Sequence, residues 1–285
     1  MFWSNSHSKF NKRRFIIMGA NNHDNMSFLE HLEELRWHII RSLTAIISAG
    51  FICFLMKEFI FDTIILGPKK MSFPTYDFLC QAATFMGIET TFCGDEFPFT
   101  VQNRTMAGQF SAHIMTSIIS GFIISFPYVL YEFWKFISPG LLDEEKARSR
   151  GFIFISSLLF FIGVLFGYYI LTPLSINFLG TYQVSNDVLN EIDLSSYIGL
   201  VRSSTLASGI IFELPIIIYF LTKAGVVTPE SLITYRKYAL VGVLVLAAII
   251  TPPDVASQII VAIPIVILYQ VSIFISRIVV KNQSK

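Results

Sequence analysis

The chain has 285 residues, of which 53% are hydrophobic and only 14% are charged, and 28 of them are phenylalanine. Soluble domains carry about 25% charged residues, so this composition excludes an ordinary soluble protein and predicts an all-α, polytopic membrane protein. The formal net charge of +1 gives no electrostatic basis for a nucleic-acid partner.

The first 25 residues are polar, and we expect them to form a disordered, basic, cytoplasmic tail. Lys12-Arg13-Arg14 resembles a targeting signal, but the apolar run behind it is too short for an h-region. A true start at Met26 is a second interpretation of the same stretch. The membrane domain is then expected to cover residues 26–280, with a short cytoplasmic tail at 281–285.

A helix is predicted to begin after Ser27, because Ser27 and Glu30 have the spacing of a capping box. The apolar span 38–57 follows, and a span needs about 20 such residues to cross a bilayer. Glu34 stands just before this span, at the membrane surface. It is either a solvated acid at an interfacial helix start or a carboxylate held there to receive a cation.

A long polar loop follows, from about residue 58 to 108, and contains Cys80 and Cys93. Neither belongs to a CxxC pair or has a neighbouring histidine, so no metal site is predicted. In an oxidising compartment the two thiols could form a disulfide, and two free cysteines are the alternative.

The second predicted span, 109–131, leads into an aromatic and acidic segment. Its aromatic residues are expected to form an interfacial belt: Tyr131, Phe133, Trp134 and Phe136. Pro139-Gly140 should end the helix, and three acids then open the next one: Asp143, Glu144 and Glu145. These acids either suit the dipole of that helix or bind a guanidinium whose apolar neighbour contacts an aromatic ring.

The third and fourth spans are predicted at 151–172 and 198–222. Gly163 and Gly167 form a GxxxG pair in the third span, which indicates close helix packing. Glu213 lies within the fourth span, where a carboxyl group is costly unless it is protonated, paired or facing a polar cavity. We favour a functional role for Glu213 over a structural hydrogen bond, and Pro215 should kink the helix beside it.

The last apolar segments are shorter or interrupted. Tyr238–Ile250 offers about 13 residues, which reach only about 20 Å as a helix. The run from Gln258 to about Val280 contains Pro264, and the turn signal between the two runs ends at Asp254. We therefore predict a tight hairpin of short fifth and sixth helices, with Asp254 and Gln258 in turn and capping roles.

The distribution of Lys and Arg predicts the orientation of these six spans. Sixteen of the 21 basic residues fall on the side that holds both termini, which places both termini in the cytoplasm. The opposite side has only five: Lys57, Lys69, Lys70, Arg104 and Arg202.

An enzyme is not supported by the sequence. There is no GxxxxGK[ST] loop for ATP, no HExxH zinc motif and no GxSxG motif near His113. Neither a cofactor nor a metal site is predicted.

Several motifs together resemble the TatC family, the C subunit of the twin-arginine translocase, over nearly the whole stretch from Ser27 to Val280. They are Phe28-Leu29-Glu30-His31-Leu32-Glu33-Glu34-Leu35-Arg36, Pro68, Phe126-Pro127 through Pro139-Gly140-Leu141, Phe212-Glu213-Leu214-Pro215 and Thr251-Pro252-Pro253-Asp254-Val255-Ala256-Ser257-Gln258.

The resemblance implies a concave six-helix bundle in the inner membrane. It implies a signal-peptide receptor that exports folded proteins with the proton motive force, in an oligomeric complex with single-span TatA/TatB-type subunits and membrane lipids. By position, the signal-peptide site would comprise Glu34, Arg36, Phe136 and Glu145. Glu213, with Gln258, would supply intramembrane polar contacts to a partner, and the structural positions would be Pro68, Pro127, Pro139, Pro215 and Asp254.

The residues favour two other classes of function less strongly. An ion-coupled small-molecule carrier would use Glu213 as a proton relay, but such folds often show internal repeats and paired broken helices, which the sequence lacks. A purely structural scaffold is disfavoured by the acidic and aromatic clusters in the predicted cytoplasmic loops.

Overall fold

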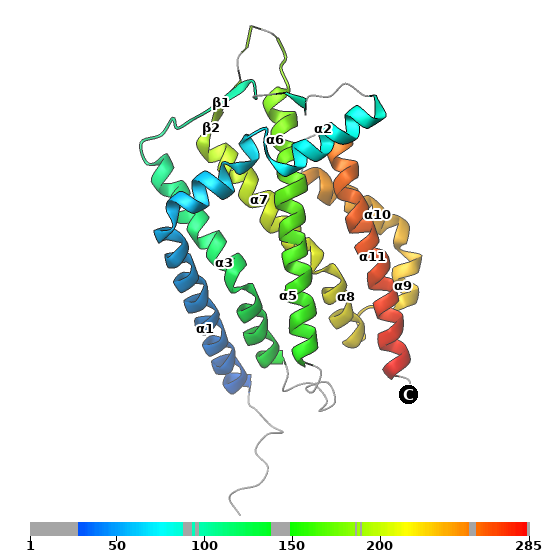
Figure 1. Cartoon of the computed structure of the whole chain (residues 1–285). Helices are drawn as coiled ribbons and strands as arrows, with labels where there is room; N and C mark the ends of the chain where they lie inside the picture. Colours follow the sequence, from blue (N-terminus) through cyan, green and yellow to red (C-terminus); the bar gives the residue numbers. More distant parts are fainter. Residues whose placement is uncertain are drawn as a thin grey trace, which may run out of the picture.

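The computed structural model describes residues 28–87, 93–94, 97–137, 149–185, 187–188, 190–250 and 255–283. These residues are mostly helical, and the long helices run side by side (Figure 1). The Glu34 end of α1, the last residues of α3 and the C-terminus lie at one end of the molecule, whereas α2 and both strands lie at the other. The start of α1, which contains Glu34, and the end of α3 are thus separated from the loop of residues 58–108 by the length of the helices.

The first two long helices are α1 (Phe28–Leu55) and α3 (Gly108–Ile137). A third runs as α5 (Ser149–Phe166) through the π-helical turn η5 (Gly167–Leu171) into α6 (Thr172–Thr181). The fourth consists of α7 (Leu194–Phe212) and α8 (Leu214–Lys223), which meet at Glu213. The chain ends with α9 (Pro229–Thr234), α10 (Arg236–Ile250) and α11 (Val255–Gln283).

Five of these helices, within the described residues, are long and apolar enough to cross a membrane. The expectation of a multi-spanning helical protein is therefore confirmed, whereas the number six is not, because α10 has only 15 residues. The prediction of a short sixth helix is wrong. Pro264 lies inside α11, which continues for 29 residues, since proline in a membrane helix is tolerated where neighbouring groups satisfy the freed carbonyl.

The all-α prediction misses a small parallel sheet. β1 (Phe99–Gln102) pairs with β2 (Asn190–Asp193), so the long loop is joined to the segment that enters α7. Asp193 then caps α7, accepting a hydrogen bond of 2.8 Å from the backbone N–H of Ser195. That hydrogen bond holds the pKa of the Asp193 carboxyl below its usual value.

A cap formed by η1 (Phe59–Ile65), η2 (Gly67–Lys69) and α2 (Pro74–Met86) covers this end of the bundle. Tyrosine hydroxyls hold it together and to the helices through main-chain oxygens. The Tyr76 hydroxyl is shared between the carbonyl of Pro68 within the cap, at 2.9 Å, and that of Pro173 in α6, at 3.1 Å. Burial raises the pKa of the Tyr76 phenol well above its usual value, so the hydroxyl stays protonated and remains a donor.

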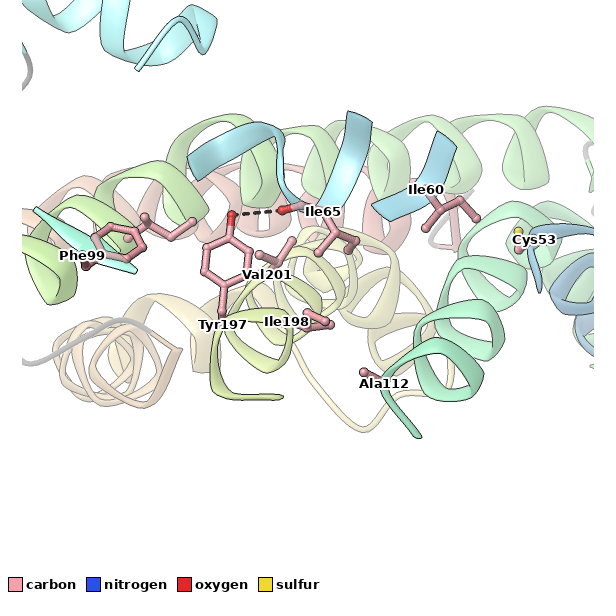
Figure 2. Packing of buried hydrophobic residues seen from close by; sticks show 9 residues of the cluster. Cys53, Ile60, Ile65, Phe99, Ala112, Tyr197, Ile198 and Val201 are labelled. Atoms are coloured by element: carbon pink, nitrogen blue, oxygen red, sulfur yellow. Dashed lines mark hydrogen bonds between the residues drawn. The ribbon is translucent and has the colours of Figure 1, made fainter. Parts of the chain in front are cut away.

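Two further tyrosines hold η1 in the same way. Tyr168 donates to the carbonyl of Ile64 at 2.8 Å, and Tyr197 of α7 donates to that of Ile65 at 3.0 Å. Figure 2 shows Tyr197 beside Val201 in the apolar cluster beneath the cap. The cap is therefore attached to the membrane helices by both apolar packing and hydrogen bonds.

The cap also contains the disulfide that the sequence left open. Cys80 of α2 is bonded to Cys93, with 5.1 Å between their Cα atoms. Cys53, which lies in α1, is a buried free thiol.

The glycine pair of the third span lies where α5 meets α7. A Cβ on Gly163 would lie 2.7 Å from the carbonyl oxygen of Ser208, and one on Gly167 would lie 2.6 Å from that of Ser204. Only glycine permits this approach of the two backbones, as the GxxxG spacing predicted.

Candidate functional site

The end of the bundle opposite the cap holds a cluster of charged residues between α1 and α3. Glu34, His38 and Arg41 are spaced by four and three residues, so they share one face of α1. Glu132 and Phe136 are spaced by four and share one face of α3. Because the two helices run antiparallel and pack together, these faces meet.

Glu132 is the central group of this cluster. Its Oε2 lies 2.6 Å from Nδ1 of His38 and 3.8 Å from Nη1 of Arg41. Glu132 is 2% exposed and His38 is 9% exposed, so the pair is out of contact with bulk water. A carboxylate that is bonded in this way is already occupied, and it is not free to bind an incoming cation.

The sequence alone does not single out Glu132 as a site residue, because Glu132 lies within a run of aromatic residues that is typical of an interfacial belt. One signal was available. Glu132 is four residues before Phe136 on the same helix face, and both precede a predicted helix end by about one or two turns.

Glu34 lies one turn before His38 and has a different environment. The residue is partly buried, and its Oε2 is buried without a hydrogen bond from any described residue. An unsatisfied, buried carboxylate oxygen costs free energy, and a charged donor such as a guanidinium would relieve it. The cluster therefore contains one paired acid, Glu132, and one acid with an unmet oxygen, Glu34.

Of the other residues expected beside Glu34, only Phe136 lies in the same cluster in the described structure. Phe136 is partly buried and contacts His38 edge-on, with 6.2 Å between the ring centroids. Arg36 is exposed, and a residue two positions from Glu34 does not share its helix face. Glu145 and Pro139 lie outside the described residues, so the structure does not place either one relative to Glu34.

One expectation for this segment is wrong. Trp134 is not part of an interfacial belt, because it is buried against Phe152 and Phe220 at ring-centroid distances of 4.6 and 5.9 Å. The helix end agrees with the prediction from Pro139-Gly140, because α3 passes through Pro127 and ends at Ile137.

Glu213 lies at the break between α7 and α8, where Pro215 occupies the first turn of the second helix. The side chain is 8% exposed. Ser156 of α5 donates a hydrogen bond of 2.5 Å to Oε2, whereas Oε1 is buried and has no partner among the described residues. The carboxyl group can therefore take part in one further hydrogen bond, as an acceptor or, when protonated, as a donor.

Gln258 and Asp254 were expected in the last hairpin. Gln258 donates to the carbonyl of Leu244 at 3.1 Å, which connects α11 to α10. Asp254 lies outside the described residues. Within the described part of the chain there is no group of three or more His, Cys, Asp or Glu side chains that could hold a metal ion.

The family model, the relatives and the solved structures that match this chain all belong to one family of translocase proteins. Residues 30–264 match the family model described as Sec-independent protein translocase protein (TatC). The relative of that name from Blattabacterium sp. subsp. Periplaneta americana is 46% identical over 264 residues, which cover 92% of this chain and 99% of the relative. The one from Aquifex aeolicus is 35% identical over 263 residues, covering 91% and 98%.

A solved structure described as the twin arginine translocase receptor TatC superposes on the chain with a TM-score of 0.66. The two are 34% identical, and the match covers 88% of this chain and 100% of the other. A second structure of that receptor, in DDM, gives a TM-score of 0.67 at 35% identity.

Proposed function

This chain belongs to the TatC family of Sec-independent protein translocases, and we propose that it is the receptor subunit for twin-arginine signal peptides in the export of folded proteins. The observation that supports the proposal most directly is the unmet Oε2 of Glu34, one helical turn before His38, which is itself paired with Glu132. The carboxylate of Glu34 is then the cation-binding group of this cluster.

The chemistry of a paired-arginine tag suits this arrangement. A guanidinium can donate two parallel hydrogen bonds to one carboxylate, and it stays charged at any physiological pH. Phe136 contacts His38, the histidine that is paired with Glu132. Its ring would contact the apolar residues that accompany the arginines. Glu145 is proposed as the acid for the second arginine, with Arg36 at the edge of the site, on the basis of family position.

The test is photocrosslinking of a twin-arginine signal peptide to membranes that contain the full chain and its native partner subunits. Glu34→Ala and Glu145→Ala should each reduce crosslinking by about tenfold to a hundredfold, because each removes a charge-assisted hydrogen bond. Lysine at either position should lower it further through like-charge repulsion. Glu191→Gln is the matched control, since Glu191 is a carboxylate at the cap end and pairs with Arg104 at 3.2 Å.

Unchanged crosslinking to both the Glu34 and Glu145 variants would refute the assignment. A signal peptide with a Lys-Lys pair should crosslink less to the unmodified protein, because lysine lacks the planar two-point geometry.

We also propose six crossings with both termini in the cytoplasm, with α10 as a short fifth crossing. The excess of basic residues on the side of the termini supports this orientation. So does the disulfide at the opposite end, since disulfides persist in oxidising compartments. The cell inner membrane is then the location, and the 281–285 tail and the residues before Met26 lie on its cytoplasmic side.

Glu213 is proposed as the contact for a single-span partner subunit of the TatA/TatB type, because Oε1 has no partner within the described chain. Transport would use the proton motive force, in line with the absence of an ATP-binding loop in the sequence. The carrier alternative is not favoured. Substrate uptake by proteoliposomes that contain this chain alone would be the result that favours it.

A further inference from the structure

Helix α2 of the cap has an exposed apolar side. Phe78 is 71% exposed and Phe85 is 92% exposed. The two are seven positions apart, close to two helical turns, so they lie on the same side of α2. Ala82 lies between them, and the exposed Met86 follows. We call Phe78, Ala82, Phe85 and Met86 the α2 face.

The rest of α2 has two further sides, so the helix is in contact with three environments. Tyr76 and Ala83, also seven positions apart, are buried against the protein. The remaining side is polar and exposed, and consists of Asp77, Gln81 and Thr84. A helix with a protein side, a polar side and a separate exposed apolar side is typical of the boundary between a membrane and water.

The disulfide brings the chain back to another side of α2. Cys80 is bonded to Cys93. Cys80 is two positions from Phe78, and residues two apart in a helix point to nearly opposite sides. The bond therefore joins α2 to the next segment without using the α2 face.

Hydrogen bonds from the first turn of α2 give its depth. Thr75 donates to the carbonyl of Tyr169, and Tyr76 donates to that of Pro173. The two acceptors come eighteen and twenty-two positions after Gly151, the first residue of a membrane-spanning segment. They lie about 27 and 33 Å along that helix, on either side of the edge of a hydrocarbon core of about 30 Å. Because α2 runs across the ends of the long helices (Figure 1), it lies at the level of the headgroups.

We propose that α2 is an interfacial anchor, and that the α2 face enters the boundary between headgroups and acyl chains in the leaflet at the cap end. The partner is the phospholipid bilayer, which meets the apolar side of a helix at this depth, while the polar side stays in water. The anchor holds the cap at a fixed depth. The inference uses neither Glu34 nor Glu213, so it is independent of the proposed signal-peptide and subunit contacts.

The test is photocrosslinking of the full chain to lipid, in membranes that contain its native partner subunits and radiolabelled phospholipid. A photoreactive benzoylphenylalanine takes the place of Phe78 or of Phe85. Each should attach about tenfold more labelled lipid than the same group in place of Gln81, because acyl chains contact only the apolar side of an interfacial helix. Gln81 is the matched control, since it is exposed on the polar side of the same helix.

Equal lipid labelling from all three positions, or none from positions 78 and 85, would overturn the inference. A crosslinked pair of chains, or an adduct with another protein in place of the lipid adduct, would assign the α2 face to a protein interface and overturn it as well.

A double variant, Phe78→Asp with Phe85→Asp, separates anchoring from folding, with the photoreactive group in place of Met86. The lipid adduct should fall about tenfold, because charged side chains leave the acyl boundary. Stability in detergent should be unchanged, because both rings are exposed. Asp77→Asn with Gln81→Asn is the control and should alter neither measurement. A retained lipid adduct, or a marked loss of stability in detergent, would contradict the anchor.

Discussion

Glu34, Glu132 and Glu213 are the same functional group in three different environments. Glu132 is bonded to His38 and Arg41, Glu213 accepts one bond from Ser156, and Glu34 has a buried oxygen without a bond. The difference decides what each can do: Glu132 stabilises the contact of α1 with α3, whereas the other two retain a binding capacity.

Glu132→Ala is expected to destabilise the protein by about 3 kcal/mol, because it leaves a buried histidine without its partner. Glu132→Gln keeps an acceptor for His38 and should cost only about 1 kcal/mol. The measurement is the free energy of unfolding in bicelles. The double variant His38→Ala with Glu132→Ala should show clear coupling between the two sites, and purely additive losses would contradict the pairing.

The sequence was informative about Glu34 and not about Glu132, for a physical reason. Glu34 follows a recognisable helix start, so its position at the membrane surface could be deduced from local rules. Glu132 acquires its role from His38, which is on another helix, and no local rule predicts which faces of two helices will meet.

At the scale of the helices, the contact of α5 with α7 depends on two glycines. Gly163→Ala and Gly167→Ala should each destabilise the protein by about 1–3 kcal/mol, because the added methyl group meets main-chain atoms of α7. Gly242→Ala in α10 is the control. A Cβ there meets nothing within 4 Å, so its higher helix propensity should make it neutral or stabilising. Equal effects at all three positions in thermal unfolding would contradict the packing.

The 15 residues of α10 give a second prediction at this scale. A helix of this length reaches only about 22 Å, less than a hydrocarbon core of about 30 Å. Translocation in proteoliposomes should therefore be greater in lipids with short acyl chains than in lipids with long ones. Activity that is independent of acyl-chain length would argue against α10 as a crossing helix.

The long helices could be predicted because each needs about 20 apolar residues, a signal that is local in the sequence. The parallel sheet could not, because Phe99 and Asn190 lie about 90 positions apart in the sequence, with at least the described helices α3, α5, η5 and α6 between them, and each strand has only four residues. Pro215 and Pro264 show that a proline in an apolar run does not by itself predict where a helix ends. The first stands at a helix break, whereas the second lies inside a continuous helix.

For the whole molecule, the disulfide tests the orientation. In intact cells, Cys80 and Cys93 should react with a membrane-impermeant maleimide only after treatment with a reductant, whereas the buried Cys53 should not react. Labelling that requires cell lysis would place the cap in the cytoplasm and reverse the proposed topology. Cys80→Ser should also lower stability by about 3 kcal/mol, since the bond closes a short loop.

The three tyrosines that hold the cap all donate to main-chain oxygens, at Ile64, Ile65, Pro68 and Pro173. Every amino acid supplies that oxygen, so the acceptor positions can drift during evolution while the bonds persist. Methods that infer contacts from correlated substitutions would find no covariation here, and the cap attachments of homologues would have to be recognised from the retained phenols alone.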